Sequence, residues 1–296
     1  MNRATEQTMN KVDIYEQRIR NIFPELSISK LSLNDKGLNN DVIEVNDELI
    51  FRFPKHERAV KKLSKESKVL NLIKNYITLD IPKIFYHDRE VIGYFMICGI
   101  PLSKDLLKEL DRGTIGLVGK QLATFLKQLH RIPKQKILDS DIPNSEIPSK
   151  YEDWLDLYQR LQDEILPRFS SSTQLRVKKH FESFLEDKSN FDYEMKLIHG
   201  DLAGEHILFN KKQKHVGGII DFGNAGLGDP AMDVAVLLYN YGEEFFSNIY
   251  QTYPEISSYL NRAKFYIELF ELPEVFSGIK SQSITWFLKD READKN

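Results

Sequence analysis

Residues 197–210 read LIHGDLAGEHILFN, and residues 217–233 read GGIIDFGNAGLGDPAMD. Short apolar runs alternate here with ionisable side chains, which are His199, Asp201, Glu205, His206, Asp221, Asp229 and Asp233. Burying charges among leucines and isoleucines is unfavourable unless they are paired, hydrogen-bonded or bound to a cation. The density of charge therefore predicts that this segment forms a functional site.

Length and composition narrow the class of protein. The chain has 296 residues, of which 41% are hydrophobic and 29% charged, and this length predicts two lobes that each close a core. The 41 basic and 44 acidic side chains give no basic surface of the kind that nucleic-acid-binding proteins need. The chain has no signal-peptide core or long apolar run, and its single cysteine, Cys98, excludes an intramolecular disulfide. We expect a cytoplasmic protein without a nucleic-acid, membrane or obligatory protein partner.

The first third of the chain is rich in short strands. Residues 11–23 have the apolar spacing of a helix, which Pro24 ends. Residues 41–54, DVIEVNDELIFRFP, predict two strands around a turn at Asn46 and Asp47. A helix carrying Glu66 and further strands follow. Gly99 and Pro101 then break the pattern and predict a hinge between lobes.

The rest of the chain is mainly helical. One buried helical face is predicted by the apolar spacing of Val118, Leu122, Phe125, Leu126 and Leu129. Residues 132–149 are rich in Pro, Lys and Asp and predict a loop, and helices resume over 149–166 and 173–187. The fold class is therefore α+β, with a small β-rich lobe over residues 1–97 and a larger helical lobe over residues 98–296.

The motifs occur in a recognisable order. IFRFPK (50–55), Glu66, the hinge, IHGDL, IDFG and GDPAMD together resemble the aminoglycoside phosphotransferase family, whose members share the protein-kinase-like fold. The spacing HGDxxxxH is similar to that of 2''-type aminoglycoside and macrolide phosphotransferases. The resemblance implies a bilobal kinase-like fold and transfer of the γ-phosphate of ATP or GTP to a hydroxyl of a small molecule. It also implies a magnesium cofactor, and an imidazole ligand at His206 would make the softer manganese ion the alternative.

The resemblance assigns roles to the charged residues. Asp201 would orient the attacking hydroxyl and accept its proton, and Asp221 would bind the metal ion. His206 stands where kinases have a metal-binding asparagine, and it is either a metal ligand or a packed side chain. As a ligand it must be neutral, so an unshifted histidine predicts weaker metal binding below a pH of about 6.5. His199 is expected to support the loop backbone, and Asp229 and Asp233 to bind loop amides at a helix start.

The nucleotide-binding residues are also carried over from the resemblance. Arg52 replaces the usual strand lysine and can still pair with Glu66, with Lys55 as a possible helper at the phosphates. Residues 33–41, LNDKGLNND, would form the phosphate-covering loop. The base would meet the segment from Met96 through Ile97 and Cys98 to Gly99, with Ile220 on its other face, although these apolar side chains could equally be core. The sequence does not decide between ATP and GTP.

The acceptor is the least determined part. Asn224 and Tyr239 stand where the 2''-type subfamily has acidic residues that bind a cationic antibiotic, and Glu243 and Glu244 could compensate. The resemblance to the family favours an aminoglycoside acceptor, and the missing acidic residues keep a macrolide as the alternative. Two other functions stay open. The protein could be a kinase of a metabolite such as choline or a sugar, or a kinase-like binding module without catalysis.

Overall fold

The computed structural model describes residues 10–270, and its internal contacts divide the chain into two units. The first unit comprises Met1–Ser67 and Pro82–Met96, and the second comprises Lys68–Ile81 and Ile97–Asn296. The division into domains at residues 97 and 98 stays a prediction, and the ends of both domains, residues 1–9 and 271–296, lie outside the described residues.

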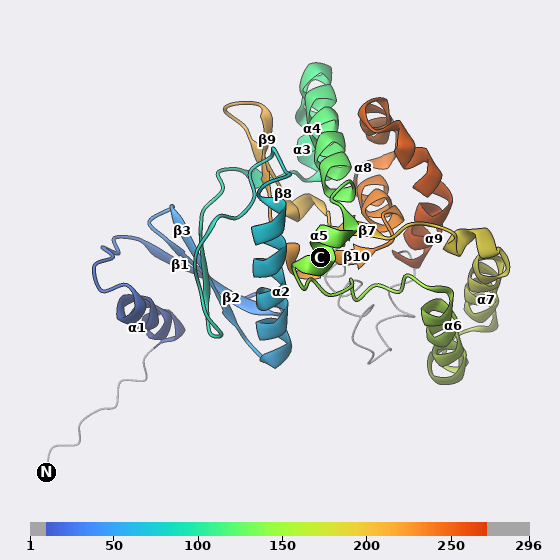
Figure 1. Ribbon diagram of the computed structural model, residues 1–296, viewed down its shortest axis with the longest axis horizontal. Helices are drawn as coiled ribbons and strands as arrows, with labels where there is room; N and C mark the ends of the chain where they lie inside the picture. Colours follow the sequence, from blue (N-terminus) through green and yellow to red (C-terminus); the bar gives the residue numbers. More distant parts are fainter. Residues whose placement is uncertain (1–9, 271–296) are drawn as a thin grey trace, which may run out of the picture. The chain divides into compact units, whose positions relative to one another are not determined.

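The first unit is built on an antiparallel five-stranded sheet in the order β1-β2-β3-β5-β4 (Figure 1). Its strands are β1 (Leu31–Asn34), β2 (Asn40–Val45), β3 (Leu49–Pro54), β4 (Ile84–His87) and β5 (Ile92–Phe95). Its helices are α1 (Lys11–Ile22) and the part of α2 (Glu57–Ile73) up to Ser67. The sheet and helix confirm the predicted strand-rich first region.

The β2–β3 hairpin follows from its turn residues and its apolar pattern. Asn46 and Asp47 have φ values of 59° and 57°, a left-handed conformation that Asn and Asp tolerate better than other side chains. The sheet face that β2 and β3 bury forms a core with Ile19 of α1. That core consists of Ile19, Ile43, Val45, Phe51, Phe53 and Val91. The predicted pair of strands and the predicted N-terminal helix are therefore both confirmed.

The second unit is mainly helical (Figure 1). Its helices are α3 (Lys104–Glu109), α4 (Arg112–His130), α5 (Lys134–Asp139), α6 (Tyr151–Arg160), α7 (Ser171–Glu186), α8 (Ala231–Thr252) and α9 (Leu260–Phe270). Its strands are β6 (Ile100–Pro101), β7 (Lys196–Ile198), β8 (Ile207–Asn210), β9 (His215–Ile219) and β10 (Gly226–Gly228), in the orders β6-β8-β9 and β10-β7. Together with the sheet of the first unit, these elements confirm the predicted α+β fold class.

Helix packing gives the second unit its core. Helix α4 packs against α8, and α8 packs against α9. The five apolar residues that predicted the buried face of α4 are all buried, which confirms that pattern. Helix α8 is interrupted at Gly242, whose φ of 79° and ψ of 173° are non-helical. The expected loop over residues 132–149 was wrong in one part, because Lys134–Asp139 form α5, which buries Ile137.

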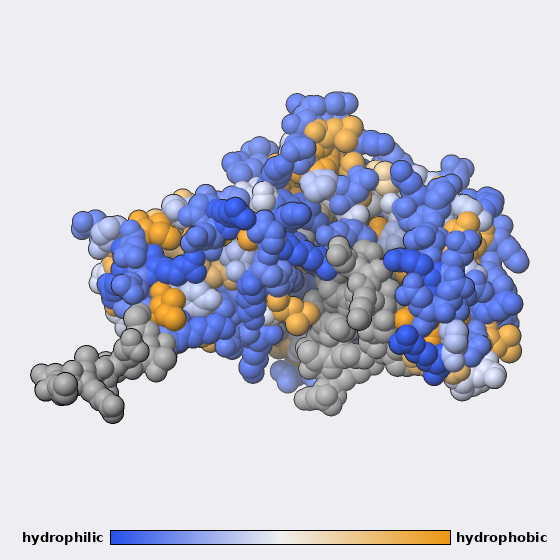
Figure 2. All heavy atoms as spheres, turned by 90° about the horizontal axis from the view of Figure 1, so that it is seen from below, coloured by the Kyte–Doolittle hydropathy of each residue, from blue (hydrophilic) through white to orange (hydrophobic). Residues whose placement is uncertain are grey.

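The described surface is mostly polar. In Figure 2, hydrophilic side chains cover most of the face that is drawn, and apolar side chains form small separate patches. Within residues 10–270, no helix combines the length and the apolar character that crossing a membrane requires.

Candidate active site

The catalytic loop predicted from the sequence lies in the second unit between β7 and β8. Leu197 and Ile198 are fully buried and fix its start, and Ile207 is fully buried and fixes its end. Gly200 has a φ of 77°, and a Cβ at this position would lie 2.9 Å from the carbonyl oxygen of Asn224. The loop therefore needs glycine here, both for the backbone conformation and for the close approach of the residue 224 segment.

Asp233, in the first turn of α8, binds the backbone of this loop. Its side chain is fully buried, and its two oxygens accept hydrogen bonds from the amides of His199 at 3.0 Å and Gly200 at 2.8 Å. The prediction that Asp233 binds loop amides is confirmed. Asp229 binds the amide of Ala231 at 2.9 Å and takes two further bonds, at 2.8 and 3.0 Å, from the guanidinium of Arg262.

His199 joins the catalytic loop to the segment before Asp221. The amide of Asp201 donates to His199 Nδ1 at 3.2 Å, and His199 Nε2 then donates to the carbonyl oxygen of Ile220 at 3.1 Å. This pattern requires a neutral imidazole. Burial lowers the pKa of His199, which agrees with a neutral ring. His199 therefore supports the backbone, as the sequence predicted.

Asp201 is buried beside two polar neighbours. Asn224 Nδ2 donates to Asp201 Oδ2 at 3.3 Å, and His206 Nδ1 lies 3.7 Å from the same oxygen. Both contacts are on one side of the carboxylate. Sequence reasoning placed Asn224 in the acceptor site and missed its bond to Asp201, because only the folded chain brings residues 201 and 224 together.

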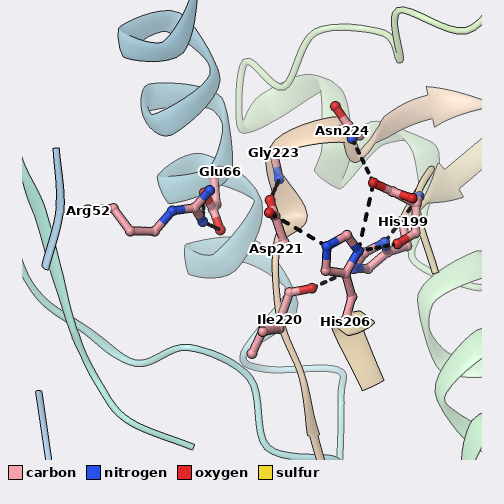
Figure 3. Close-up of polar contacts among 9 residues, drawn as sticks. Arg52, Glu66, His199, His206, Ile220, Asp221, Gly223 and Asn224 are labelled. Atoms are coloured by element: carbon pink, nitrogen blue, oxygen red, sulfur yellow. Dashed lines mark hydrogen bonds and ion pairs between the residues drawn. The ribbon is translucent and has the colours of Figure 1, made fainter. Parts of the chain in front are cut away.

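His206 contacts both Asp201, the predicted base, and Asp221, the predicted metal ligand, and Figure 3 shows its ring beside Asp221. Its Nδ1 donates to the carbonyl oxygen of Asp201 at 2.8 Å, and its Nε2 lies 3.9 Å from Asp221 Oδ2. Asp221 adopts a φ of 63°, a conformation that costs a non-glycine residue roughly 1–3 kcal/mol and that often occurs at functional sites. The structure thus brings Asp201, His206 and Asp221 together, and their roles remain proposals.

The donor atoms of His206 and Asp221 fit a magnesium ion. The Nδ1 hydrogen bond leaves Nε2 of a neutral imidazole with its lone pair on the side of Asp221. Among residues 10–270, no three His, Cys, Asp or Glu side chains converge on one cation site. Magnesium usually keeps several waters and takes one or two protein ligands together with substrate phosphates, so a pair is sufficient.

The charge of His206 depends on the carboxylates around it. Burial opposes the charged form, but the attraction of Asp201 and Asp221 prevails and raises the pKa of His206 to about 9. Without a metal ion His206 is therefore an imidazolium at neutral pH. Metal affinity should consequently fall as the pH decreases below about 9, whereas an unshifted histidine predicted a fall below about 6.5.

We expect manganese binding to the wild-type protein at pH 7.5 to release about one proton, because Nε2 must lose its proton before it can bind a cation. In His206→Asn an amide oxygen replaces the nitrogen, so affinity is partly kept and proton release disappears. His206→Ala should lose most of the affinity. Calorimetric titration in two buffers of different ionisation enthalpy measures both quantities. Superimposable metal titrations for His, Asn and Ala at residue 206, from pH 5.5 to 9, would show that the side chain only packs.

In the first unit, the predicted pair of Arg52 and Glu66 forms. Arg52 Nη1 donates to both carboxylate oxygens of Glu66 at 2.9 Å, and both residues are buried (Figure 3). Arginine thus forms the ion pair that the resemblance assigns to a lysine at this strand position, with a planar head in place of an ammonium. The pairing is confirmed, and the contact of Arg52 with phosphates stays a prediction.

The predicted base-binding residues lie just after strands: Met96, Ile97 and Cys98 follow β5, and Ile220 follows β9. Met96 and Ile97 are half-buried, and Cys98 is exposed. The amide of Met96 already donates to the carbonyl oxygen of Glu48 at 2.7 Å, so this donor is engaged within the first unit. Ile220 is half-buried, and its amide donates to the carbonyl oxygen of His206 at 3.0 Å. Their contact with a base stays a prediction.

The other predicted acceptor residues lie on α8. Tyr239 is half-buried and packs edge-on against Phe270, with ring centroids 5.4 Å apart. Glu243 and Glu244 are exposed and directly follow the break at Gly242. Their carboxylates are therefore accessible to solvent, and their role in acceptor binding stays a prediction.

A cavity of about 480 Å³ lies elsewhere in the second unit, between the segment 144–150 and α6. Its acidic lining residues are Glu146, Glu152, Asp153 and Asp156, and its basic ones are Lys150 and Arg160. The segment is tied to β10, because the amide of Ser145 donates to the carbonyl oxygen of Leu227 at 2.8 Å. The sequence assigned residues 144–149 to a loop and gave no signal of this cavity.

Comparisons with known proteins find similar sequences over most of the chain. Residues 30–266 match the sequence model of a family described as a phosphotransferase enzyme family. A viomycin phosphotransferase from Streptomyces vinaceus is 26% identical over 155 residues, which are 52% of this chain and 51% of that protein. The matched region is therefore about half of each of the two proteins.

Solved structures resemble the fold over nearly its whole length. The GDP and kanamycin complex of APH(2")-IIia has a TM-score of 0.81 and 25% identity, covering 96% of this chain and 99% of that chain. Macrolide 2'-phosphotransferase type I has a TM-score of 0.71 and 20% identity, covering 97% of both chains. These likenesses confirm the predicted kinase-like fold.

Proposed function

The chain belongs to the phosphotransferase enzyme family, and we propose that it transfers the γ-phosphate of a nucleoside triphosphate to a hydroxyl of an antibiotic, with an aminoglycoside as the first candidate. The observation that carries this proposal is the grouping of Asp201, His206 and Asp221 on one loop system. A carboxylate for proton transfer beside a pair of metal-binding side chains is the set that phosphoryl transfer requires.

Asp201 would act as the base. Its Oδ2 is held on the side of Asn224 and His206, so the other oxygen, Oδ1, would accept the proton of the acceptor hydroxyl. The hydroxyl oxygen forms a bond to the γ-phosphorus, the bond to the bridging oxygen breaks, and the nucleoside diphosphate leaves. A hydrogen bond from Asn224 keeps the carboxylate oriented, which is most of what this reaction asks of the protein.

Asp221 and His206 would hold the metal ion, and Arg52 would face the phosphates of the donor. A bound magnesium ion supplies neutralisation of the charge on the phosphate oxygens. Glu66 fixes the guanidinium of Arg52 through two 2.9 Å bonds and so limits the rotamers of a long side chain. Related structures contain GDP, which supports GTP as a donor, and ATP is the other candidate donor.

A cationic acceptor is favoured over a neutral one. Glu243 and Glu244 are exposed on α8, where they could pair with ammonium groups. A related structure holds kanamycin. The macrolide alternative rests on the neutral Asn224 and Tyr239. A metabolite kinase keeps the same chemistry, and a binding module without catalysis is disfavoured by the retained Asp201 and Asp221. We also propose a cytoplasmic location, since one cysteine suits a reducing compartment.

An acceptor screen tests this proposal. We expect magnesium-dependent formation of nucleoside diphosphate with an aminoglycoside or, failing that, with a macrolide, using ATP and GTP in parallel. Mass spectrometry should find an acceptor heavier by one phosphate. Phosphorylation of choline or a sugar alone would contradict the antibiotic assignment and keep the chemistry. Absence of transfer to every acceptor and of nucleotide binding would contradict the proposed function as a whole.

A further inference from the structure

The loop of residues 35–39, between β1 and β2, is held by Lys55, which directly follows β3. Lys55 Nζ donates to the carbonyl oxygens of Asp35 at 2.7 Å and Gly37 at 2.5 Å, and the amide of Lys55 donates to the carbonyl oxygen of Asn39 at 2.8 Å. The loop itself is largely exposed, with Leu38 at 53%. Its shape therefore depends on these bonds to Lys55.

The bonds to Lys55 orient the peptide groups of the loop. In a trans peptide the carbonyl of one residue and the amide of the next point in opposite directions. Because the carbonyl of Gly37 faces the ammonium, the amide of Leu38 is directed away from it. Backbone amides that point out of a turn are the groups with which loops bind anionic oxygens. Lys55 thus determines which side of the loop presents amides to a phosphate.

Asp41 holds Lys55 in turn. Its carboxylate is 3% exposed and lies 3.3 Å from Lys55 Nζ, and it also binds Lys11 at 3.0 Å and the hydroxyl of Tyr15 at 2.5 Å. Burial alone would raise the pKa of Asp41, but the hydrogen bonds from Tyr15, Lys11 and Lys55 lower it. The carboxylate therefore stays charged opposite the ammonium of Lys55.

Two of these partners come from helix α1, which precedes the residues that match the family model. Tyr15 stacks on Phe53 of β3 with ring centroids 4.5 Å apart, and Lys11 also reaches Asp35 of the loop at 3.4 Å. The helix is thus anchored both to the sheet and to the loop. Its polar contacts converge on the residue that fixes Lys55.

We propose that Lys55 is a positioning residue that shapes loop 35–39 for the phosphates of the nucleotide donor, and that helix α1 holds Lys55 in place through Asp41. This inference rests on the proposed function, because it assumes that the loop contacts the nucleotide donor. A positioning role differs from direct binding of the phosphates by Lys55. The three hydrogens of its ammonium already serve two carbonyl oxygens and one carboxylate.

The two roles of Lys55 predict opposite results for Asp41→Asn. If Lys55 bound phosphate directly, removal of the opposing charge would free the ammonium and leave triphosphate binding equal or tighter. If Lys55 positions the loop, the same change loosens it and weakens triphosphate binding. Lys55→Met should have the same effect as Asp41→Asn. Tyr15→Phe, which deletes one hydrogen bond without a change of charge, should act in the same direction and more weakly.

Calorimetric binding of magnesium complexes to the full-length protein tests this, with adenosine, ADP and ATP and the guanine series as probes. We expect Asp41→Asn and Lys55→Met to raise the Kd of the triphosphate by about tenfold and Tyr15→Phe by about threefold, from the usual range of single hydrogen bonds. The Kd of the nucleoside should not change. Lys30→Met is the matched control, because Lys30 pairs with Asp47 in the same unit away from the loop and should bind like the wild type.

Several outcomes would overturn the inference. Unchanged or tighter triphosphate binding by Asp41→Asn and Tyr15→Phe would do so, and so would equal weakening of nucleoside and triphosphate. The Tyr15→Phe result decides the matter if Asp41→Asn does not fold. A wild-type protein that binds no nucleotide would remove the proposed function and this inference together, whereas nucleotide binding that none of these variants alters removes the inference alone.

Discussion

An Asp201→Asn variant should fold and bind nucleotide like the wild type and turn over roughly 10²- to 10⁴-fold more slowly, the usual contribution of a positioned general base. The substitution keeps the shape of the side chain, and the amide oxygen can still accept the 3.3 Å bond from Asn224. The amide cannot take up the proton of the acceptor hydroxyl. Turnover with the acceptor found by screening, the melting temperature and the Kd of the nucleotide measure the three expectations.

A neighbouring carboxylate provides the control for this prediction. Glu205 lies in the same loop and is exposed, so Glu205→Gln removes one negative charge near His206 without touching Asp201. Solvent screens exposed charges, and we expect turnover within about fivefold of the wild type. Comparable losses in the two variants would mean that the loop needs negative charge in general. Near wild-type turnover of Asp201→Asn would exclude Asp201 as the base.

Local pattern was enough to predict most of the fold. The apolar spacing of α4 identified its buried face from Val118 to Leu129, and the Asn46–Asp47 turn identified the β2–β3 hairpin. Both signals are local, because one period or one turn conformation determines them. Helix α5 was missed since a helix of six residues with one buried side chain leaves almost no periodic signal. The break at Gly242 was missed because a single glycine within a helical pattern does not reveal its φ.

The site, like the fold, was predictable where the signal is local in sequence and not where it depends on distant residues. Ordered motifs identified Asp201, His206 and Asp221, because the loop residues lie close in sequence and each has a chemical role of its own. The roles of Asn224, Lys55 and Tyr15 could not be predicted. Their contacts join residues that are 23, 18 and 26 positions apart, at Asp201, Gly37 and Asp41 respectively. Such contacts depend on strand register and helix packing, which a single sequence does not specify.

Asp233→Ala should be the most destabilising single substitution among those considered for this site. It leaves the buried amides of His199 and Gly200 without their acceptor, and each unpaired buried donor costs about 1–3 kcal/mol. His130 Nε2, at 3.1 Å from the same carboxylate, loses its partner as well. We expect the melting temperature to fall by roughly 10 °C, at about 2–4 °C per kcal/mol for a unit of this size.

The same substitution should also slow catalysis, because the freed loop carries Asp201. His130→Gln separates the two contributions. It removes one neighbour of Asp233 and keeps both bonds from the carboxylate to the loop, so it should lower the melting temperature by less and leave turnover closer to the wild type. Glu186→Ala, at an exposed carboxylate in α7, controls for the loss of an acidic side chain from a helix. If Asp233→Ala melts and turns over like Glu186→Ala, the loop is held by its own backbone and its flanking strands, and the buried carboxylate at residue 233 is not what fixes Asp201 in place.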